Sequence, residues 1–573
     1  MSKTQFSLTG HDSSISVVRC AKDGSKVASG QSTQVGFMAD VILWDFNTKA
    51  QLHRLSLHKG TVNAIAFSHS DKYVVTLGGR DDSQIIIWDV VSGVALANAV
   101  SHTDGALECC FYSRSETGML TCGMNHVKTW TYDEVKKKLK SDPVNLGSLK
   151  RTFTGVCVNA DDTVAYCGTQ SGDLIEIGLP TFIQKRVGPL KTQFPLGISV
   201  CALIPQGDML VGTGEGVIAK ISTSTLRVVC QRLVVGGGIT SLSLTPDGTK
   251  VFVGTVNSYM YIADTETLEA ELRTTCHTSR VNAIAFPHNM SEVVATASTS
   301  EIRVWNTGSK QELLRIVVAN TECFCLDFSL DGKSIVSGWS DGKLRAFTPQ
   351  SGKLIYAISD AHKEGVTALK MLSDCTRIVS GGMKGEVRIW KVQANFQELV
   401  VSMKEHRGRV WDIVIRTEDD GRAVSASADG SCIVWDMQSK CRVLCIFEPT
   451  VFKSLVYHPD FSQIVTVGSD RKISYNDVFT GETLRVIEGA SEGHELTGIA
   501  ISRSGSHLAI VGADGLVKLI DYESGEFVAT GKGHSTSVSA VAIAPNQAFV
   551  VTGGSDGALF FWQVPAKMAL CFV

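Results

Sequence analysis

One pattern recurs thirteen times along this chain of 573 residues. A short apolar run closes on a residue that is usually aromatic or aliphatic, and the next such position follows 41 to 47 residues later. The positions are Trp44, Trp88, Trp130, Ile177, Ile221, Ala263, Trp305, Phe347, Trp390, Trp435, Asn476, Ile520 and Trp562. A repeat of this length is one supersecondary unit that cannot bury its apolar face alone, so neighbouring repeats must pack against one another.

The best copies of the repeat end in Trp-Asp, and this dipeptide with this period is typical of WD repeats. Each such repeat supplies about four short antiparallel strands to one blade of a β-propeller. Thirteen blades exceed a single ring of about four to eight blades. The sequence therefore predicts an all-β fold class, with tandem WD-repeat β-propellers in two rings.

We expect residues 1–268 to form the first propeller, with six recognisable blades. Residues 269–573 should form the second propeller, with seven blades, and the joint should fall near Glu266 to His277. Propellers of this kind serve mainly as rigid platforms for other proteins, so a binding function is favoured over catalysis.

The strands of one repeat are clearest in residues 405–436. Apolar residues alternate in RVWDIVIR and AVSASADG, as in half-buried strands, whereas CIVW is the continuous apolar run of a strand covered on both faces. Acidic, Asn and Gly residues stand between the runs, where turns require them.

Four positions of a repeat can form a buried hydrogen-bonded chain, which we call the tetrad. They are a His before the first strand, a Ser or Thr on the second, an Asp in the next turn and the Trp of the third. Two repeats fit this pattern: His406, Ser425, Asp429 and Trp435, and His534, Thr552, Asp556 and Trp562. A Ser-His-Asp catalytic triad is the alternative, but the pattern repeats in several blades and no nucleophile-elbow sequence surrounds the Ser. We therefore predict that both groups are structural.

Other repeats have lost parts of the tetrad. Asp341 stands with Phe347 in the Trp place, and Lys384 replaces the turn Asp before Trp390. Because strand burial by itself can hold a blade together, these repeats are still expected to fold as blades.

Composition narrows the function further. The chain is 44% apolar and 19% charged with a formal net charge of -3, so it lacks the basic excess of a nucleic-acid-binding protein. No stretch has the apolar length that spans a bilayer, and the first residues lack the apolar core of a signal peptide. The sixteen cysteines form no Cys-x-x-Cys pair, which favours reduced core thiols over a metal site.

Enzyme motifs are represented only by fragments. Gly212-Thr-Gly214-Glu-Gly216 resembles half of a dinucleotide fingerprint, but it lies where other repeats have a turn. Gly332-Lys333-Ser334 resembles the end of a phosphate loop, but Asp327 stands where the leading Gly should be. We expect no enzyme activity, no catalytic residue, no cofactor, no metal and no small-molecule substrate.

Several longer stretches resemble one narrower family. They include loops that ordinary WD repeats do not share, and they are residues 38–46, 55–60, 187–200, 312–318, 331–368, 373–390 and 456–475. On these stretches, which run nearly end to end, the chain is similar to the cilia- and flagella-associated protein 52 family. The resemblance implies a tandem double propeller inside the B-tubule of ciliary doublet microtubules, near the inner junction, in contact with tubulin and other axonemal proteins.

Two departures from this family's pattern lead to expectations. Family members carry about one further blade before the residues MSKTQFSLTGH, so the first ring is expected to lack one N-terminal blade and to be open or strained at its seam. In the eleventh repeat Asn476 replaces the family's Trp, which should loosen the packing of that blade without changing the fold.

These observations favour a non-catalytic structural microtubule inner protein, which binds tubulin and inner-junction proteins and stabilises the axoneme. It would lie in the cytoplasm, in the cytoskeleton of a cilium or flagellum, without nucleic acid or membrane insertion. An actin-filament disassembly factor with tandem propellers is one alternative. A WD-repeat substrate receptor of a ubiquitin ligase is another, although such receptors often show Trp-Asp-x-Arg and the Trp-Asp copies here continue as Phe46-Asn47, Val90-Val91 and Met437-Gln438.

One basic segment is a candidate partner-contact surface. Residues 132–143 read as an insertion after the third blade's inner strand, and they carry four lysines: Lys136, Lys137, Lys138 and Lys140. Tubulin is acidic, so exposed lysines would attract it over a long range, in a way that salt weakens. A solvated loop or short helix without a partner is the alternative. Arg407 and Arg409, beside His406, leave the same two possibilities open.

Overall fold

The computed structural model describes residues 8, 10–102, 105–190, 194–205, 207–233, 236–393, 396–488, 491 and 493–564. These residues form forty-nine β-strands and no helix. All strand pairs in the sheets are antiparallel, and most sheets have four strands. The prediction of an all-β fold made of tandem propellers is confirmed.

The chain divides into two compact units, Met1–Thr274 and Thr275–Val573, which we call unit 1 and unit 2. This division falls a few residues after the expected boundary at 268/269. The reason is strand β24 (Ala270–Thr275), whose residues up to Thr274 belong to the last sheet of unit 1.

Unit 1 contains six four-stranded sheets, and each sheet is one blade. The first three are β1 (Ser14–Cys20), β2 (Lys26–Ser32), β3 (Met38–Asp45) and β4 (Gln51–Lys59); β5 (Val62–Phe67), β6 (Tyr73–Gly78), β7 (Gln84–Asp89) and β8 (Ala95–Val100); and β9 (Ala106–Phe111), β10 (Gly118–Gly123), β11 (His126–Asp133) and β12 (Lys138–Pro143). The others are β13 (Phe153–Val158), β14 (Val164–Thr169), β15 (Leu174–Gly178) and β16 (Ile183–Gly188); β17 (Ile198–Leu203), β18 (Met209–Thr213), β19 (Val217–Ile221) and β20 (Val228–Leu233); and β21 (Ile239–Leu244), β22 (Lys250–Thr255), β23 (Tyr259–Asp264) and β24.

Unit 2 begins with a six-stranded sheet that holds two blades. It comprises β25 (Val281–Ala285), β26 (Val293–Asn306), β27 (Glu312–Phe328), β28 (Ile335–Trp339), β29 (Leu344–Phe347) and β30 (Leu354–Ile358). The first half of β26 pairs with β25 and its second half with β27, and the chain turns at Ser300, whose φ is 62°. Strand β27 is shared in the same way, because its first half pairs with β26 and its second half with β28.

The remaining blades of unit 2 follow in chain order. They are β31 (Val366–Met371), β32 (Arg377–Gly382), β33 (Val387–Gln393) and β34 (Phe396–Met403); β35 (Val410–Ile415), β36 (Arg422–Ser427), β37 (Ser431–Asp436) and β38 (Cys441–Phe447); β39 (Phe452–Tyr457), β40 (Gln463–Gly468), β41 (Ile473–Asp477) and β42 (Thr483–Ile487); β43 (Leu496–Ile501), β44 (His507–Gly512), β45 (Leu516–Asp521) and β46 (Phe527–Lys532); and β47 (Val538–Ile543), β48 (Phe549–Gly554) and β49 (Leu559–Gln563).

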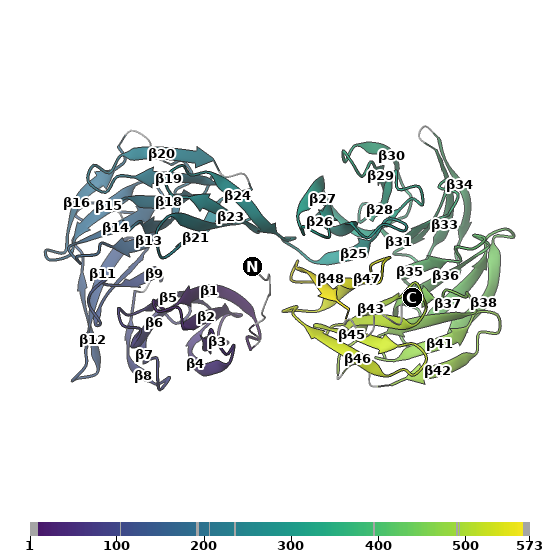
Figure 1. Ribbon diagram of the computed structural model, residues 1–573, viewed down its shortest axis with the longest axis horizontal. Helices are drawn as coiled ribbons and strands as arrows, with labels where there is room; N and C mark the ends of the chain where they lie inside the picture. The colour runs from purple at the N-terminus through teal and green to yellow at the C-terminus, as the bar shows by residue number, and fades with distance from the viewer. Residues whose placement is uncertain are drawn as a thin grey trace. The chain divides into compact units, whose positions relative to one another are not determined.

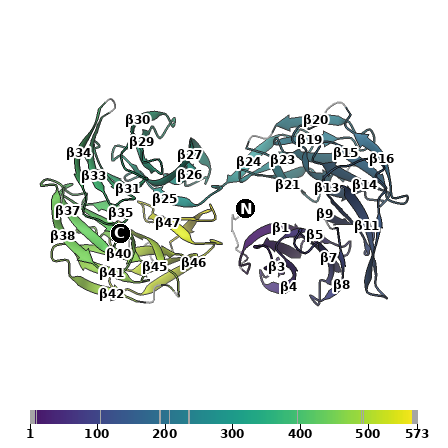
Figure 2. The ribbon, with the colours of Figure 1, turned by 180° about the vertical axis from the view of Figure 1, so that it is seen from behind.

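In each unit the sheets surround a common centre, toward which each blade turns its first strand (Figures 1 and 2). The apolar core lies between adjacent blades. For example, Val379 and Ile389 of one blade pack in one cluster with Ile413 and Ile433 of the next. Middle strands such as β36 are therefore buried on both faces, whereas outer strands such as β38 are largely exposed.

Unit 2 closes into a ring. Its last blade packs through β47 and β48 against β25 of its first blade. The Ser539 hydroxyl donates a hydrogen bond to the Val281 carbonyl, and the Asn546 N–H donates to the Ser291 hydroxyl at 2.9 Å. Side-chain bonds of the same kind join consecutive blades inside the unit, as between Thr367 and the Val410 carbonyl.

Unit 1 has two end sheets with exposed faces. Ile15, near the start of β1, is 53% exposed, whereas the matching residues Val62 and Ile198 of other blades are at most 1% exposed. At the other end, Ser199 donates a hydrogen bond to the Ile239 carbonyl of the sixth blade, but the matching residue of that blade, Thr240, is exposed. In the described part of unit 1, the first and the sixth sheets are therefore open to solvent.

Candidate functional site

The predicted group at His406 forms a continuous chain of side chains within one blade. The Ser425 hydroxyl lies 2.7 Å from His406 Nε2 and accepts a hydrogen bond from Trp435 Nε1 at 2.8 Å. His406 Nδ1 lies 2.8 Å from the Ser431 hydroxyl and 3.4 Å from an Asp429 carboxylate oxygen. Ser431, which the sequence pattern did not single out, therefore stands between the histidine and the aspartate.

Burial and hydrogen bonding set the ionisation of this group. Burial lowers the pKa of His406, although Asp429 opposes that shift. Burial raises the pKa of Asp429, but hydrogen bonds from Ser431 and from the Arg407 N–H outweigh it, so that the pKa of this carboxyl is lowered. The tetrad therefore combines an ionised aspartate with a neutral imidazole at neutral pH.

The second predicted group is also assembled. His534 Nδ1 lies 3.2 Å from both carboxylate oxygens of Asp556, and His534 Nε2 lies 2.8 Å from the Thr552 hydroxyl. Trp562 Nε1 donates to the same hydroxyl at 2.8 Å. In each group the hydrogen bonds join a turn to the strand beside it. The turn is the one before β37 in the group at His406 and the one before β49 in the group at His534.

Incomplete repeats keep the remaining bonds of the pattern. His362 Nε2 lies 2.8 Å from the Ser380 hydroxyl, and Trp390 Nε1 donates to that hydroxyl at 3.0 Å. Lys384, in the place of the aspartate, forms an exposed ion pair with Glu364 at 2.9 Å. The buried Nδ1 of His362 has no hydrogen-bond partner among the described residues.

Two further positions show how the pattern has changed. Asn476 is fully buried in the place of the Trp, and its amide nitrogen lies 3.5 Å from the Thr466 hydroxyl. Asp341 forms an ion pair with Arg345 at 2.6 Å. Polar bonds therefore persist in both repeats without a complete tetrad.

One complete tetrad was missed by the sequence pattern. His58 lies 2.7 Å from both Asp82 and the Thr76 hydroxyl, and Trp88 donates to that hydroxyl at 2.8 Å. Thr76 and Trp88 are 12 residues apart, whereas the matching separation at Trp562 is 10. The usable signal was the separation of 18 residues between His58 and Thr76, which equals that between His534 and its threonine.

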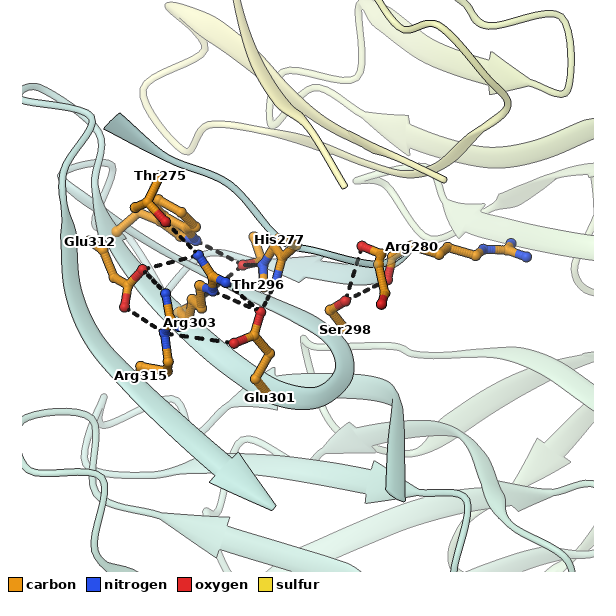
Figure 3. Close-up of polar contacts among 11 residues, drawn as sticks. Thr275, His277, Arg280, Thr296, Ser298, Glu301, Arg303, Glu312 and Arg315 are labelled. Atoms are coloured by element: carbon orange, nitrogen blue, oxygen red, sulfur yellow. Dashed lines mark hydrogen bonds and ion pairs between the residues drawn. The ribbon is translucent and has the colours of Figure 1, made fainter. Parts of the chain in front are cut away.

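A second missed group uses glutamate instead of aspartate (Figure 3). His277 Nδ1 lies 2.7 Å from Glu301, and His277 Nε2 lies 2.7 Å from the Thr296 hydroxyl, to which Trp305 donates at 2.8 Å. The side chain of Arg303 lies beside this group and is only 1% exposed.

Arg303 makes an extended ionic network with its neighbours. Its guanidinium contacts Glu301 at 2.7 Å and Glu312 at 3.1 Å, and it donates to the Thr275 hydroxyl at 2.8 Å. Arg315 pairs with Glu312 at 2.8 Å and with Glu301 at 3.6 Å. Burial raises the pKa of Glu301, but bonds from His277 and Arg303 outweigh burial and hold it at about 2. Two arginines and two glutamates therefore balance their charges inside the first blade of unit 2 (Figure 3).

The tetrads lead to a first stability prediction. Asp429→Ala should destabilise its blade by about 1–3 kcal/mol, because Ser431, His406 and the Arg407 N–H all lose a part-buried acceptor. Lys384→Ala should have almost no effect, because an exposed ion pair contributes little. Hydrogen exchange of the blade that carries each substitution tests this, and equal losses of stability would contradict the network.

The lysine segment lies on a hairpin, and this corrects the expected insertion. Lys138 and Lys140 belong to β12, the outermost strand of the third blade, which pairs with β11 along its whole length. Lys136 and Lys137 form the turn before it. All four side chains are exposed, and Lys136 and Lys140 lie 3.8 and 3.6 Å from Asp133 and Asp142.

Three further observations concern metal binding, membrane spans and the glycine-rich segment at Gly212. Within them no three His, Cys, Asp or Glu side chains form a group that could hold a metal ion. No helix in the described part of the chain is long and apolar enough to cross a membrane. In the Gly212 to Gly216 segment, Gly212 ends strand β18 together with Thr213, and residues 214–216 form the turn to β19, with Gly216 at a φ of 85°.

The repeated blades and their tetrads define a WD-repeat β-propeller protein. A family model described as "WD domain, G-beta repeat" matches residues 49–89, 269–306, 311–347, 352–391, 397–436, 481–521 and 525–563. The chain belongs to the cilia- and flagella-associated protein 52 family, as its resemblance to that family predicted.

Three members of the family illustrate the similarity. The protein of Chlamydomonas reinhardtii is 41% identical over 571 residues, which cover 99% of this chain and 92% of the relative. The mouse protein is 39% identical over 561 residues, covering 97% and 90%, and the human protein is 38% identical over 566 residues, covering 98% and 91%.

Proposed function

We propose that this protein is a non-catalytic structural component of ciliary and flagellar doublet microtubules. It binds tubulin and inner-junction proteins from within the doublet and stabilises the axoneme. The observation that carries the proposal is the similarity, over nearly the whole chain, to relatives named cilia- and flagella-associated protein 52. The protein would accordingly lie in the cytoskeleton of the cilium or flagellum.

The architecture supports a bridging role. A propeller is a rigid support whose loops and outer strands can contact several subunits at once, and simultaneous weak contacts give avidity. The tetrads are explained as internal supports of the blades, because their histidines are buried and bonded within one sheet. This leaves the surface of the blades as the part that meets partners.

The lysine hairpin is the proposed contact with tubulin. Lys137 and Lys138 have no ion pair within the described chain, and both stand at the outer edge of a blade. Their attraction to an acidic partner is long-ranged and weakens as salt screens it.

Fractionation of cilia tests the proposed function. The protein should remain with the doublets after detergent removes the membrane and the matrix, because it binds the lattice. Increasing salt should then release part of it. Recovery entirely in the soluble matrix, or normal abundance in cells that build no cilia, would contradict the proposal and favour the actin or ubiquitin-ligase alternative.

Charge variants test the contact surface separately. Replacing the four hairpin lysines by glutamine should lower the salt concentration at which the protein leaves the doublets. The matched control replaces four scattered exposed lysines of unit 1, Lys22, Lys59, Lys150 and Lys185. If both variants elute at the same salt concentration, the hairpin is not the contact surface.

A further inference from the structure

The first strand of each blade in unit 2 contains a β-bulge near its start, which in the second blade is the bulge after Cys323, in the second half of β27. A bulge redirects one side chain out of the regular alternation. In four blades the residue at the bulge donates a hydrogen bond to a backbone carbonyl of the next blade: Asn282, Thr367, Thr497 and Ser539. In the other three blades the bulge residue is Phe324, Trp411 or Lys453. The side chains of these three residues therefore do not make the hydrogen bond that joins neighbouring blades elsewhere in the ring.

The three exceptional residues form one cluster with Arg409, linked through the Trp411 ring. The guanidinium carbon of Arg409 lies 3.8 Å from the ring centre of Trp411 and 5.1 Å from that of Phe324. The amino group of Lys453 lies 4.1 Å from the ring centre of Trp411. Two cations thus share one indole, although like charges repel. The four side chains form a patch at the inner ends of the first strands, which we call the central rim.

Arg409 is the unusual member of the central rim. Within the described chain no carboxylate forms an ion pair with it, and its buried Nε has no hydrogen-bond partner. Burial lowers its pKa, and the positive charge of Arg280 adds to this effect, although Cys325 and Glu322 oppose it. A partly desolvated cation without a counter-ion is unfavourable, so an anion bound there would relieve the cost.

The charges around the rim indicate what kind of anion fits. The cations are Arg280, Arg409 and Lys453, and the anions are Glu322, which accepts from Asn282 at 2.8 Å, and Glu495, which lies 3.5 Å from Lys453. The part-buried Asp412 adjoins Trp411 and accepts from the Ser454 hydroxyl at 2.7 Å, so the charges balance in number, but Arg409 has no ion-paired carboxylate in the described chain. A single carboxylate can pair with Arg409, whereas a phosphate dianion would meet repulsion from Glu322 and Glu495. The part-exposed ring of Phe324 can pack against the methylene groups of a glutamate.

We propose that the central rim of unit 2 binds an aspartate or glutamate side chain in an acidic segment of a partner protein. The guanidinium of Arg409 holds the carboxylate through charge-assisted hydrogen bonds, and the exposed Arg280 attracts the segment. This proposal rests on the proposed function, because the partner would be one of the proteins that the propellers bridge.

Peptide binding to the purified full-length protein tests the inference. The probe is a fluorescently labelled Gly/Ser peptide that carries two glutamates, and its analogue carries two glutamines. The acidic peptide should bind and the analogue should not. Arg409→Met should weaken binding at least tenfold, because charge-assisted bonds are lost. Arg442→Met is the matched control, since Arg442 lies on the outer strand β38 and pairs with Glu405.

Two further arms make the outcome decisive. Arg280→Met changes an exposed residue, so it should weaken peptide binding without affecting the fold, even if Arg409→Met disturbs folding. Inorganic phosphate should displace the peptide only at concentrations where chloride does so too. Equal binding of the two peptides, unchanged binding by both variants, or selective displacement by phosphate would overturn the proposal. The assay contains no microtubules, so its failure and the failure of the fractionation experiment can be told apart.

Discussion

Glu301→Ala is expected to destabilise the first blade of unit 2 by about 3–5 kcal/mol. The substitution removes an anion that contacts His277 at 2.7 Å and the buried Arg303 at 2.7 Å. Arg303 would keep Glu312 at 3.1 Å, but the blade would hold one uncompensated positive charge. Removing one member of a buried ionic network costs folding stability, because the charge that remains cannot be solvated by water.

Hydrogen exchange of β26 measures this effect directly, because a protein of two units does not unfold in a single step. The matched control is Glu364→Ala, which removes a glutamate from an ion pair with Lys384 whose side chains are both more than half exposed. That change should cost at most about 1 kcal/mol. If both substitutions raise exchange equally, burial does not determine the strength of the network.

Unit 2 is also expected to lose stability when the pH falls from about 6.5 to about 4. Burial lowers the pKa of His362 to about 4 from an ordinary value of 6.5, with Arg388 adding to the effect. In this window the unfolded chain binds a proton that the folded chain does not, so stability rises with pH between the two values. The contribution of His362 is fully present above pH 6.5, and about 3 kcal/mol is lost by pH 4.

His362→Gln removes the titration and serves as the comparison. Other buried histidines such as His277 and His406 also have lowered pKa values, so the difference between wild type and variant is the quantity to measure. Hydrogen exchange of β32, the strand that carries Ser380, at pH 7 and pH 4 should show a loss about 3 kcal/mol smaller in the variant. Identical pH profiles would show that His362 does not remain neutral in the folded protein.

The blades were predictable because each is a local unit whose strands follow one another in the chain. Alternating apolar residues and turn residues predict such hairpins well. The tetrads at His406 and His534 were found for the same reason, since all members lie within one repeat. His58 was missed because its turn is longer, and His277 because Glu301 occupies the place of the aspartate.

The lysine hairpin shows a limit of the same reasoning. A charged outer strand has no apolar periodicity, because it lies at the perimeter where only one side is paired. Its sequence therefore resembled an insertion. The central rim lies beyond sequence reasoning for another reason. Phe324 and Arg409 come from blades with one blade between them, and only the arrangement of the blades around a common centre brings them together.

Closure of unit 2 has a consequence during protein synthesis. The bond from Ser539 to the Val281 carbonyl joins residues that are 258 positions apart. Hairpins within a blade form in roughly microseconds, but a ribosome needs on the order of tens of seconds to add this many residues. The apolar edge of the first blade therefore stays exposed to solvent until the last blade has been synthesised. This interval is when the nascent chain is most exposed to aggregation and most in need of a chaperone.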